Sequence, residues 1–229
     1  MNLYETIFAR RSVRQYDKTP LDAAALTEIK NHVDGAKQIL GQSARFEIAD
    51  SDKLKGGFAP HAILAFSEDS DAALVNVGCT LQGMDLWLQS SGYGSIWCGM
   101  AAPKDAAGDY RILLGFGKTS VPLRTVESEF KRKKISDISN EDNAVARAAR
   151  LAPSAVNFQP WKLTFAAGKV TAASNVRGVG RILPGRLYLI DLGIVLKHVV
   201  IALEHEGKTV TAIDAAGAGK DSAIEVSYE

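Results

Sequence analysis

The sequence has few cysteines, little net charge and no metal-ligand spacing among its histidines. Its two cysteines, Cys79 and Cys98, cannot build a disulfide framework, so we expect the protein in a reducing compartment, the cytoplasm. The 27 Lys and Arg residues balance 26 Asp and Glu residues to a net charge of +1, which argues against general binding of nucleic acids. The four histidines lack the spacing of metal ligands, so no metal site is expected.

Long uninterrupted hydrophobic runs are also missing. The most apolar stretch, residues 187–203, contains Asp191, Lys197 and His198, which favour a helix with one wet stripe over a membrane span. The first eleven residues lack the apolar core of a secretory signal, so no export is expected. What remains is an ordinary globular composition of 229 residues, 46% hydrophobic and 23% charged, with enough length for a substantial core.

Two apolar helices of the sequence align with each other without a gap. The apolar periodicity predicts helices over residues 71–92 and 188–207, and each pattern closes on a glycine. In this alignment Gly78 matches Gly193, an offset of 115 residues, and twice this offset is about the length of the chain. Such an offset indicates duplication of one unit, and the alternative is a chance match of common Leu and Gly residues.

The patterns around these two helices fit the same unit in both halves of the chain. The first half is expected to contain a helix over 21–40 and strands over 45–49, 62–66 and 112–116. The second half is expected to contain a helix over 141–152, strands over 162–166, 187–190 and 209–213, and a terminal edge strand over 224–228. We therefore predict an α+β fold of two related halves, residues 1–138 and 139–229, with antiparallel or mixed sheets and buried central helices.

Three arginines and one serine lie within five residues near the N-terminus. The sequence of residues 10–14, Arg-Arg-Ser-Val-Arg, concentrates guanidinium groups that can bind a phosphate bidentately, and the Ser12 hydroxyl adds a neutral donor. We call residues 10–14 the arginine hook. It is a candidate anion site, and the alternative is a solvated basic edge.

A second candidate segment follows the helix expected over residues 141–152. Residues 153–161 have the sequence Pro-Ser-Ala-Val-Asn-Phe-Gln-Pro-Trp, in which two prolines enclose a hydroxyl and two side-chain amides. Because the prolines restrict the backbone, this segment, the proline loop, is expected to present polar groups that could bind the edge of a heterocycle. The alternative is a plain connection between a helix and a strand.

Together the two segments resemble the FMN-dependent nitroreductase family, in which an N-terminal RRSxR holds the FMN phosphate and a PSxxNxQPW loop follows the next helix. Residues 81–86 and 92–99 also look like the family's central helix and the turn after it. The usual member is a homodimer with two FMN sites, each taking RRSxR from one subunit and the loop from the other. Here the first half lacks the loop near residues 39–45, and the second half lacks RRSxR near residues 137–143.

The resemblance therefore implies a fused pseudo-dimer of the single-chain type, with one FMN per chain between its halves and no need for a second chain. A backbone N–H within residues 96–99 would lie near the flavin N5, with Cys98 as a packing residue. Arg132 and Lys134 would add basic groups at the phosphate, whereas a solvated surface run is the alternative for residues 131–134. The implied FMN-binding residues are Arg10, Arg11, Ser12, Arg14, Ile96, Cys98, Gly99, Arg132, Lys134, Pro153, Ser154, Ala155, Asn157 and Gln159.

The implied activity is an FMN-dependent oxidoreductase that takes electrons from NADH or NADPH and passes them to a small aromatic or quinone-like acceptor by a ping-pong cycle. No catalytic side chain is implied, because the chemistry resides on FMN, and Trp97, Trp161 or Phe158 could line the acceptor pocket. A non-catalytic FMN-binding or carrier protein with the inherited fold is one alternative. A degenerate structural protein without flavin is another.

Overall fold

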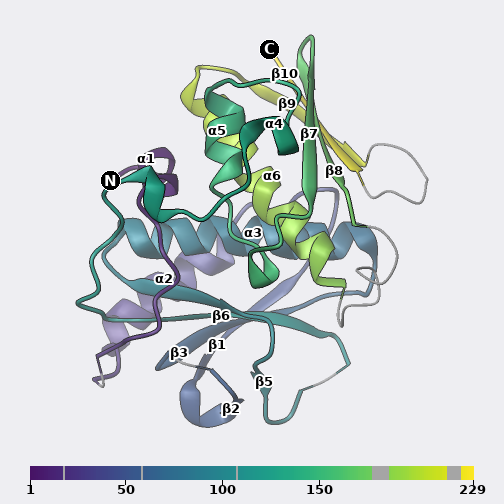
Figure 1. Ribbon diagram of the computed structural model, residues 1–229. Helices are drawn as coiled ribbons and strands as arrows, with labels where there is room; N and C mark the ends of the chain where they lie inside the picture. The colour runs from purple at the N-terminus through teal and green to yellow at the C-terminus, as the bar shows by residue number, and fades with distance from the viewer. Residues whose placement is uncertain (18, 58, 107, 177–185, 216–222) are drawn as a thin grey trace.

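The computed structural model describes residues 1–229 except 18, 58, 107, 177–185 and 216–222. Its centre is a pair of long crossing helices, α3 (Asp71–Ser90) and α6 (Leu187–His205). Figure 1 shows one sheet below α3 and a second sheet beyond α6, so the helix pair is the middle layer of the molecule. The two helices bury most of their surfaces in a single apolar cluster that both halves share.

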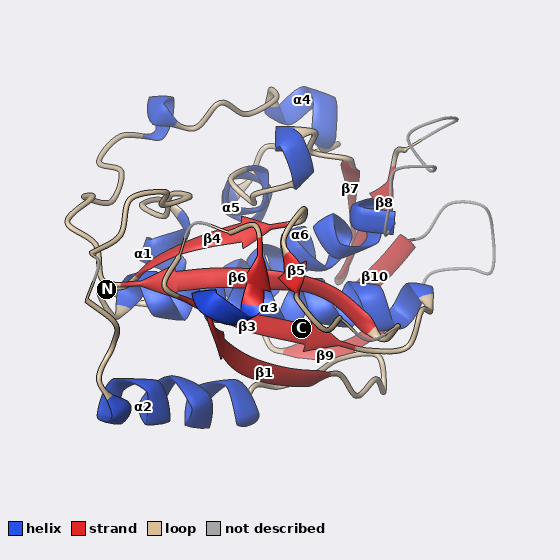
Figure 2. Ribbon diagram, turned by 90° about the horizontal axis from the view of Figure 1, so that it is seen from below, coloured by secondary structure: helices blue, strands red, loops and turns tan. Residues whose placement is uncertain are grey.

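The first sheet is antiparallel and has the strand order β1-β3-β6-β4. Figure 2 shows this sheet from its outer side, with helix α2 (Ala23–Asp34) along the β1 edge. Every residue of β3 is buried, because α3 covers one face of the sheet and a smaller apolar cluster covers the other. The strands are β1 (Arg45–Asp50), β3 (His61–Phe66), β4 (Gly94–Cys98) and β6 (Tyr110–Gly117), and a ribbon of β2 (Leu54–Lys55) and β5 (Ala102–Pro103) lies beside them.

The second sheet has the same arrangement, in the order β7-β8-β10-β9, and all its pairs are antiparallel. In both sheets the last strand in sequence lies between the second and the third. The terminal strand is therefore interior, and the prediction of an edge strand was wrong because β9 pairs with its far side. The strands are β7 (Trp161–Ala166), β8 (Lys169–Ser174), β9 (Val210–Ala215) and β10 (Ala223–Tyr228), and helix α5 (Ala144–Arg150) precedes them.

Two further predictions about the second half were wrong. Residues 187–190, predicted as a strand, begin α6, because a short apolar run has the same appearance in a buried strand and a buried helix. The strand that precedes the central helix in the second half is instead β8, whose alanines give little alternation of apolar and polar residues in the sequence. The wet stripe predicted for α6 is also absent at two of its positions, since Asp191 is 4% exposed and His198 is 0% exposed.

The two long helices cross at a pair of glycines. A Cβ added to Gly78 would lie 2.1 Å from the carbonyl oxygen of Ile190, and one added to Gly193 would lie 2.0 Å from that of Val75. Val75 and Ile190 are 115 residues apart, as are the two glycines. The crossing thus consists of two contacts that repeat each other at the offset found in the sequence, the arrangement of an isologous interface.

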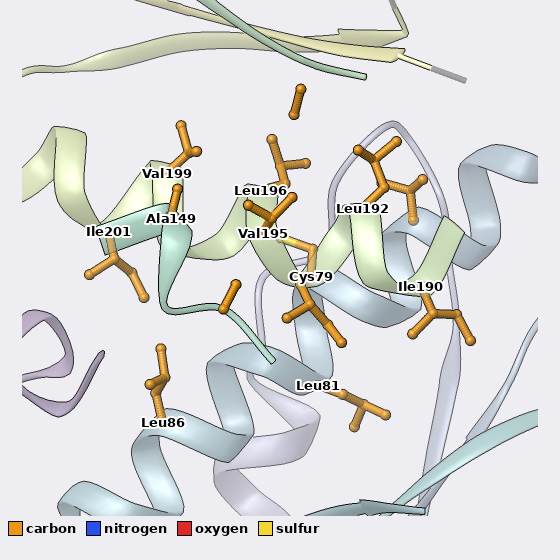
Figure 3. Packing of buried hydrophobic residues seen from close by; sticks show 14 of the residues in the cluster. Cys79, Leu81, Leu86, Ala149, Ile190, Leu192, Val195, Leu196, Val199 and Ile201 are labelled. Atoms are coloured by element: carbon orange, nitrogen blue, oxygen red, sulfur yellow. The ribbon is translucent and has the colours of Figure 1, made fainter. Parts of the chain in front are cut away.

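Apolar side chains surround this crossing on both helices. Figure 3 shows them as one cluster, with Cys79 and Leu81 from α3 and Val195 and Leu196 from α6. The short helix α1 (Leu3–Ile7) leads the chain from its N-terminus across both long helices to the arginine hook. The arginine hook therefore begins next to the central helix pair.

Candidate functional site

The arginine hook is fixed through its backbone to α3 and β4. The Gln89 side chain accepts the Arg11 N–H at 2.9 Å and donates to the Arg11 carbonyl at 3.0 Å. The Val13 N–H donates to the Ser95 carbonyl at 2.9 Å, and Ser12 forms a parallel bridge with Ser95. The hook consequently extends the free edge of the first sheet, next to β4.

Arg10 enters the core and meets a carboxylate there. Its side chain is 1% exposed, and its Nε lies 2.8 Å from Oδ2 of Asp85, although the N–H does not have hydrogen-bond geometry. Asp85 also accepts hydrogen bonds from Ser95 at 2.6 Å, Gln89 at 3.1 Å and Gln82 at 3.2 Å. Among the described residues, Arg10 Nη2 is buried without a hydrogen-bond partner, so one donor of this guanidinium is left for another acceptor.

The other two arginines of the hook lie closer to solvent than Arg10. Arg11 Nη2 lies 2.6 Å from the carboxylate of Glu129, and Arg14 is exposed. A backbone hydrogen bond from Thr125, followed by weaker contributions that include the charge of Arg11, lowers the pKa of Glu129. The three guanidinium groups of the hook therefore do not converge on a single point.

The proline loop is an irregular turn with an unusual backbone. Val156, Asn157 and Gln159 have positive φ values of 45°, 58° and 51°, a conformation that costs a residue other than glycine about 1–3 kcal/mol. Ser154 Oγ accepts the Gln159 N–H at 2.8 Å, and the Asp191 carboxylate accepts the Ala155 N–H at 2.9 Å. Buried contacts at the base of the loop thus hold a backbone that would otherwise relax.

The segment of residues 131–133 is bonded to the proline loop. Arg132 Nη1 donates to Asn157 Oδ1 at 2.6 Å, and Asn157 Nδ2 donates to the Lys131 carbonyl at 2.7 Å. The Lys133 N–H donates to Gln159 Oε1 at 2.8 Å, and Gln159 is only 3% exposed. The two amides of the loop therefore fix its position, with Asn157 at the surface and Gln159 inside.

Three arginines connect the hook to the loop, and we call Arg10, Arg124 and Arg132 the arginine cluster. Arg124 Nη1 donates to the Arg10 carbonyl, and Arg124 lies 4.3 Å and Arg132 5.6 Å from the centre of the Phe130 ring. Burial and, secondarily, repulsion by Arg10, Arg124 and Arg150 lower the pKa of Arg132 to about 9. Burial, then repulsion led by Arg10, lowers the pKa of Arg124 to about 10. Asp85 is the counter-charge of Arg10, while Arg124 and Arg132 donate to neutral oxygens, so the cluster carries a net positive charge.

Lys134 lies apart from this cluster. It lines a cavity of about 650 Å³ together with Glu127, Asp142 and Arg150. Arg150 is bonded there to Glu127 at 2.5 Å, so the cavity contains charges of both signs. Of the two basic residues expected near a phosphate, the structure brings Arg132 to the proline loop and places Lys134 in this cavity.

The expected residues outside the hook, the proline loop and the basic segment are Ile96, Cys98 and Gly99, which lie in strand β4 or directly after it. Ile96 and Cys98 are buried and stand opposite Gly115 and Leu113 of β6. Gly99 follows the strand and faces α6, since a Cβ there would lie 3.4 Å from Leu187. Because main-chain groups alternate along a strand and the Ser95 carbonyl faces the hook, the Trp97 N–H points to the same free edge.

A buried hydrogen-bond chain runs from β4 across both long helices to α5. Trp97 Nε1 donates to Gln82 Oε1 at 3.1 Å, and Gln82 Nε2 lies 3.1 Å from His198 Nε2. His198 Nδ1 lies 2.9 Å from the Ala148 carbonyl. Burial lowers the pKa of His198 to about 3, so the ring is neutral, donates from Nδ1 to Ala148 and accepts from Gln82 at Nε2.

Sequence reasoning missed Arg124, Gln82, Asp85 and the roles of Asp191 and His198. A usable signal was present for three of them, because Asp85, Asp191 and His198 are ionisable residues in otherwise apolar helices, and such groups need partners when buried. Arg124 gave no signal, since nothing local distinguishes it from other surface arginines.

Two antiparallel sheets around a crossed helix pair, with an arginine hook on one half and a proline loop on the other, define an α+β protein of nitroreductase-like fold. The family model described as "Putative TM nitroreductase" matches residues 2–203, and the chain belongs to this family. No curated protein matches the sequence. Within the described residues, no helix is long and apolar enough to span a membrane.

Solved structures resemble the chain to different extents. A "putative nitroreductase" from Thermotoga maritima matches with a TM-score of 0.72 and 23% identity, covering 99% of this chain and 93% of its own. A nitroreductase family protein from Clostridium difficile 630 has a TM-score of 0.50 and 19% identity, covering 62% of this chain and 100% of its own. A "putative nitroreductase in complex with fmn" from Desulfovibrio desulfuricans has a TM-score of 0.48 and 17% identity, covering 62% of this chain and 96% of its own.

Proposed function

We propose that the chain is an FMN-dependent NAD(P)H oxidoreductase with one FMN site, formed where the arginine hook of residues 1–138 meets the proline loop of residues 139–229. The observation that carries this proposal is the arginine cluster. It lies between the two segments, its charges repel one another, and it contains buried donors without partners among the described residues. A site of this kind favours an anion with several acceptor oxygens.

Support for an internal pseudo-dimer comes from the backbone. The two sheets have the same strand order and pairing, and the helix crossing repeats its contacts at an offset of 115 residues. In a homodimer, such isologous contacts relate two copies of one chain. We propose that they relate two halves of one chain here, and that the protein works as a monomer.

The residues of the cluster fit a phosphate group. Arg10 Nη2 and Arg132 Nε are buried and lack hydrogen-bond partners among the described residues. Arg124 is close enough to both arginines for their positive charges to repel one another. A bound phosphate would satisfy such donors and relieve the repulsion that, in addition to burial, lowers the pKa values of Arg124 and Arg132. We therefore assign the FMN phosphate to the arginine cluster, with Ser12 of the hook and Asn157 of the loop beside it.

When bound, FMN would supply the redox chemistry, taking hydride at N5 from NADH or NADPH and passing electrons to a small aromatic or quinone-like acceptor in a ping-pong cycle. The chain's part is to hold the ring and favour negative charge near N5. Among residues 96–99, the Trp97 N–H at the free edge of β4 is a donor suited to this role. The Trp97–Gln82–His198 chain fixes that edge to both halves.

The acceptor pocket is best assigned to Phe158 among the aromatic candidates. Trp161 is fully buried, and the indole of Trp97 is bonded to Gln82. Phe158 is 49% exposed, and Lys133 Nζ lies 5.3 Å from the centre of its ring. An exposed aromatic ring next to a cation suits a flat, electron-poor acceptor.

Visible absorption of the purified protein with added FMN, followed by NADPH or NADH under anaerobic conditions, tests the proposal. We expect a bound flavin whose absorption near the yellow maximum is lost when the nucleotide is added. A flavin that binds and stays oxidised would identify a carrier protein. Failure of FMN to bind at all would contradict the assignment of the site.

Arg132→Ala tests the phosphate assignment. Loss of charge-assisted hydrogen bonds worth about 1.5–3 kcal/mol is expected to weaken FMN binding by about 10- to 100-fold. Arg147→Ala is the matched control, because Arg147 lies on the neighbouring helix α5, is exposed and is paired with Asp142. Equal FMN affinity of both variants, measured by quenching of flavin fluorescence, would place the phosphate elsewhere.

A further inference from the structure

The first half contains a turn with the backbone of the proline loop. Leu40 and Gly41 have positive φ values of 59° and 63°, and Val156 and Asn157 have values of 45° and 58°. Both pairs are 116 residues apart, close to the offset of the central helices. The first half has thus kept the loop conformation although it has lost the loop sequence.

Each pair of left-handed residues is enclosed by the same hydrogen bond. The Gln42 N–H donates to the Ile39 carbonyl at 3.1 Å, and the Phe158 N–H donates to the Ala155 carbonyl at 2.9 Å. Both partners are again 116 residues apart. The match therefore extends over four consecutive residues of each turn.

A buried side chain on a central helix anchors each turn. Asn76 of α3 accepts the Ile39 N–H at 2.8 Å, and Asp191 of α6 accepts the Ala155 N–H at 2.9 Å. Asn76 is 0% exposed and Asp191 is 4% exposed, and the two positions are 115 residues apart. The same anchor is present in both halves, with an amide in one and a carboxyl group in the other.

The buried environment of Asp191 makes its hydrogen bond to the loop important for stability. Burial raises the pKa of Asp191 to about 7, and the Ala155 N–H opposes this shift. A carboxyl group placed in so apolar a position lowers stability unless a donor compensates it. The Ala155 N–H is that donor, and it belongs to the loop that carries Asn157.

We propose that Asp191 is the positioning residue of the proline loop, and thereby of the FMN site, an inference that rests on the proposed function. By accepting the Ala155 N–H, it keeps Val156 and Asn157 in their left-handed conformation. This conformation directs the Asn157 amide to Arg132 of the arginine cluster. Asn76 performs the same task for a turn that no longer serves a cofactor.

Three variants of the full chain test this role. Asp191→Ala removes the acceptor, Asp191→Asn retains one and copies the amide found at Asn76, and Asn76→Ala is the matched control in the other half. FMN binding is measured by fluorescence quenching, and the anchoring itself by hydrogen exchange at the amides of Ala155 and Ile39. If Asp191→Ala does not fold, Asp191→Leu fills the same space without an acceptor.

Above pH 7, where Asp191 is ionised, we expect Asp191→Ala to speed exchange at Ala155 and to weaken FMN binding by about 10- to 100-fold, the equivalent of one hydrogen bond to a charged acceptor. Asp191→Asn should restore both to near wild-type values. Asn76→Ala should speed exchange at Ile39 alone and leave FMN affinity unchanged. Wild-type FMN affinity in Asp191→Ala, or an equal loss in Asn76→Ala, would overturn the proposal.

Failure of the proposed function gives a different result. If the wild-type chain binds no FMN, the oxidoreductase assignment falls, while exchange at Ala155 still reports on the anchor. Unchanged exchange at Ala155 in the folded Asp191→Ala variant would then overturn the positioning role by itself.

Discussion

Where α3 and α6 cross, Gln82 meets His198 on one side and Gly83 meets Lys197 on the other. These two contacts are equivalent, because position 82 corresponds to 197 and position 83 to 198 at the 115-residue offset. The first contact belongs to a hydrogen-bond chain between both halves, whereas at the second the stem of a lysine lies over a glycine. Equivalent backbone positions thus hold very different chemistry.

We call the two sheets and the crossed helices the frame of the molecule. The difference between the two contacts distinguishes residues that stabilise this frame from residues that form the candidate site. The glycine crossing, the sheet order and the anchored turns occur in both halves, and they serve packing and backbone geometry. Within the part of the chain that the structure describes, the buried ion pair of Arg10 and Asp85 and the polar chain through Gln82 have no equivalent at the matching positions of the other half. Features found once are therefore the best candidates for function, and features found twice are candidates for stability.

The largest effect is expected where the comparison is most unequal, at Asp85. Its counterpart at the 115-residue offset is Val200, which is half-buried. Asp85→Ala leaves the Arg10 guanidinium buried without its counter-charge and should lower the free energy of unfolding by about 3–5 kcal/mol. Val200→Ala should cost about 1 kcal/mol. Urea denaturation of both variants checks this, and losses of similar size would contradict the asymmetry.

The anchors Asp191 and Asn76 should differ in their response to pH. The pKa of Asp191 is raised from 3.8 to about 7, so the folded chain binds this proton more tightly than the unfolded chain does. Its contribution to stability is therefore greatest below about pH 4, declines as the pH rises to about 7, and is constant above. At about 1.4 kcal/mol for each pH unit between those values, the change is about 4 kcal/mol.

Asp191→Asn should remove this dependence, and the difference in unfolding free energy between variant and wild type should grow from pH 4 to pH 7. The reciprocal variant Asn76→Asp places a carboxyl group at the equivalent buried position of the first half, and it should introduce a similar decline of the unfolding free energy as the pH rises. Chemical denaturation at a series of pH values measures both. A difference that is independent of pH would show that Asp191 is ionised throughout this range.

The glycine crossing should respond equally in the two halves. Gly78→Ala and Gly193→Ala each place a methyl group against a backbone carbonyl of the other helix and should cost about 3 kcal/mol. Gly83→Ala is the control, because its methyl would meet only the flexible end of Lys197, and alanine favours a helix by about 1 kcal/mol over glycine. Unequal effects at the two crossing glycines would indicate that the frame is not symmetric.

The smallest effect concerns the helices that precede the two turns. Asp22 caps α2 by accepting the Ala25 N–H, and Asn143 caps α5 by accepting the Ala146 N–H, both at 2.9 Å. Replacement of either residue by alanine should lower the free energy of unfolding by about 1 kcal/mol. Thermal denaturation of the two variants side by side would reveal whether the caps, like the crossing, contribute equally.

Much of the fold could be predicted where periodicity was strong. The helix predicted over 71–92 is α3, and the strands predicted over 45–49 and 162–166 are β1 and β7. The strand β4 was missed because it is only five residues long and begins at a glycine. Short or alanine-rich strands depend on their neighbours in the sheet for stability, and this information is not local in the sequence.

The candidate site was predictable only in part, for a similar reason. The arginine hook and the proline loop stand out as contiguous segments, so their residues could be named from the sequence. The cluster that links them could be named only in part. The resemblance implied Arg10 and Arg132, whereas Arg124 lies far from Arg10 along the chain and is brought to it by folding. Asp85 likewise acquires its role only when folding brings Arg10 to it, and His198 only through the packing of α3 and α6.

Titration of the purified chain with FMN, with the bound flavin counted per polypeptide, tests most directly whether a duplicated frame carries a single site. We expect saturation at one FMN for each chain, in a protein that sediments as a monomer. Saturation at two, or no binding at any concentration, would contradict it.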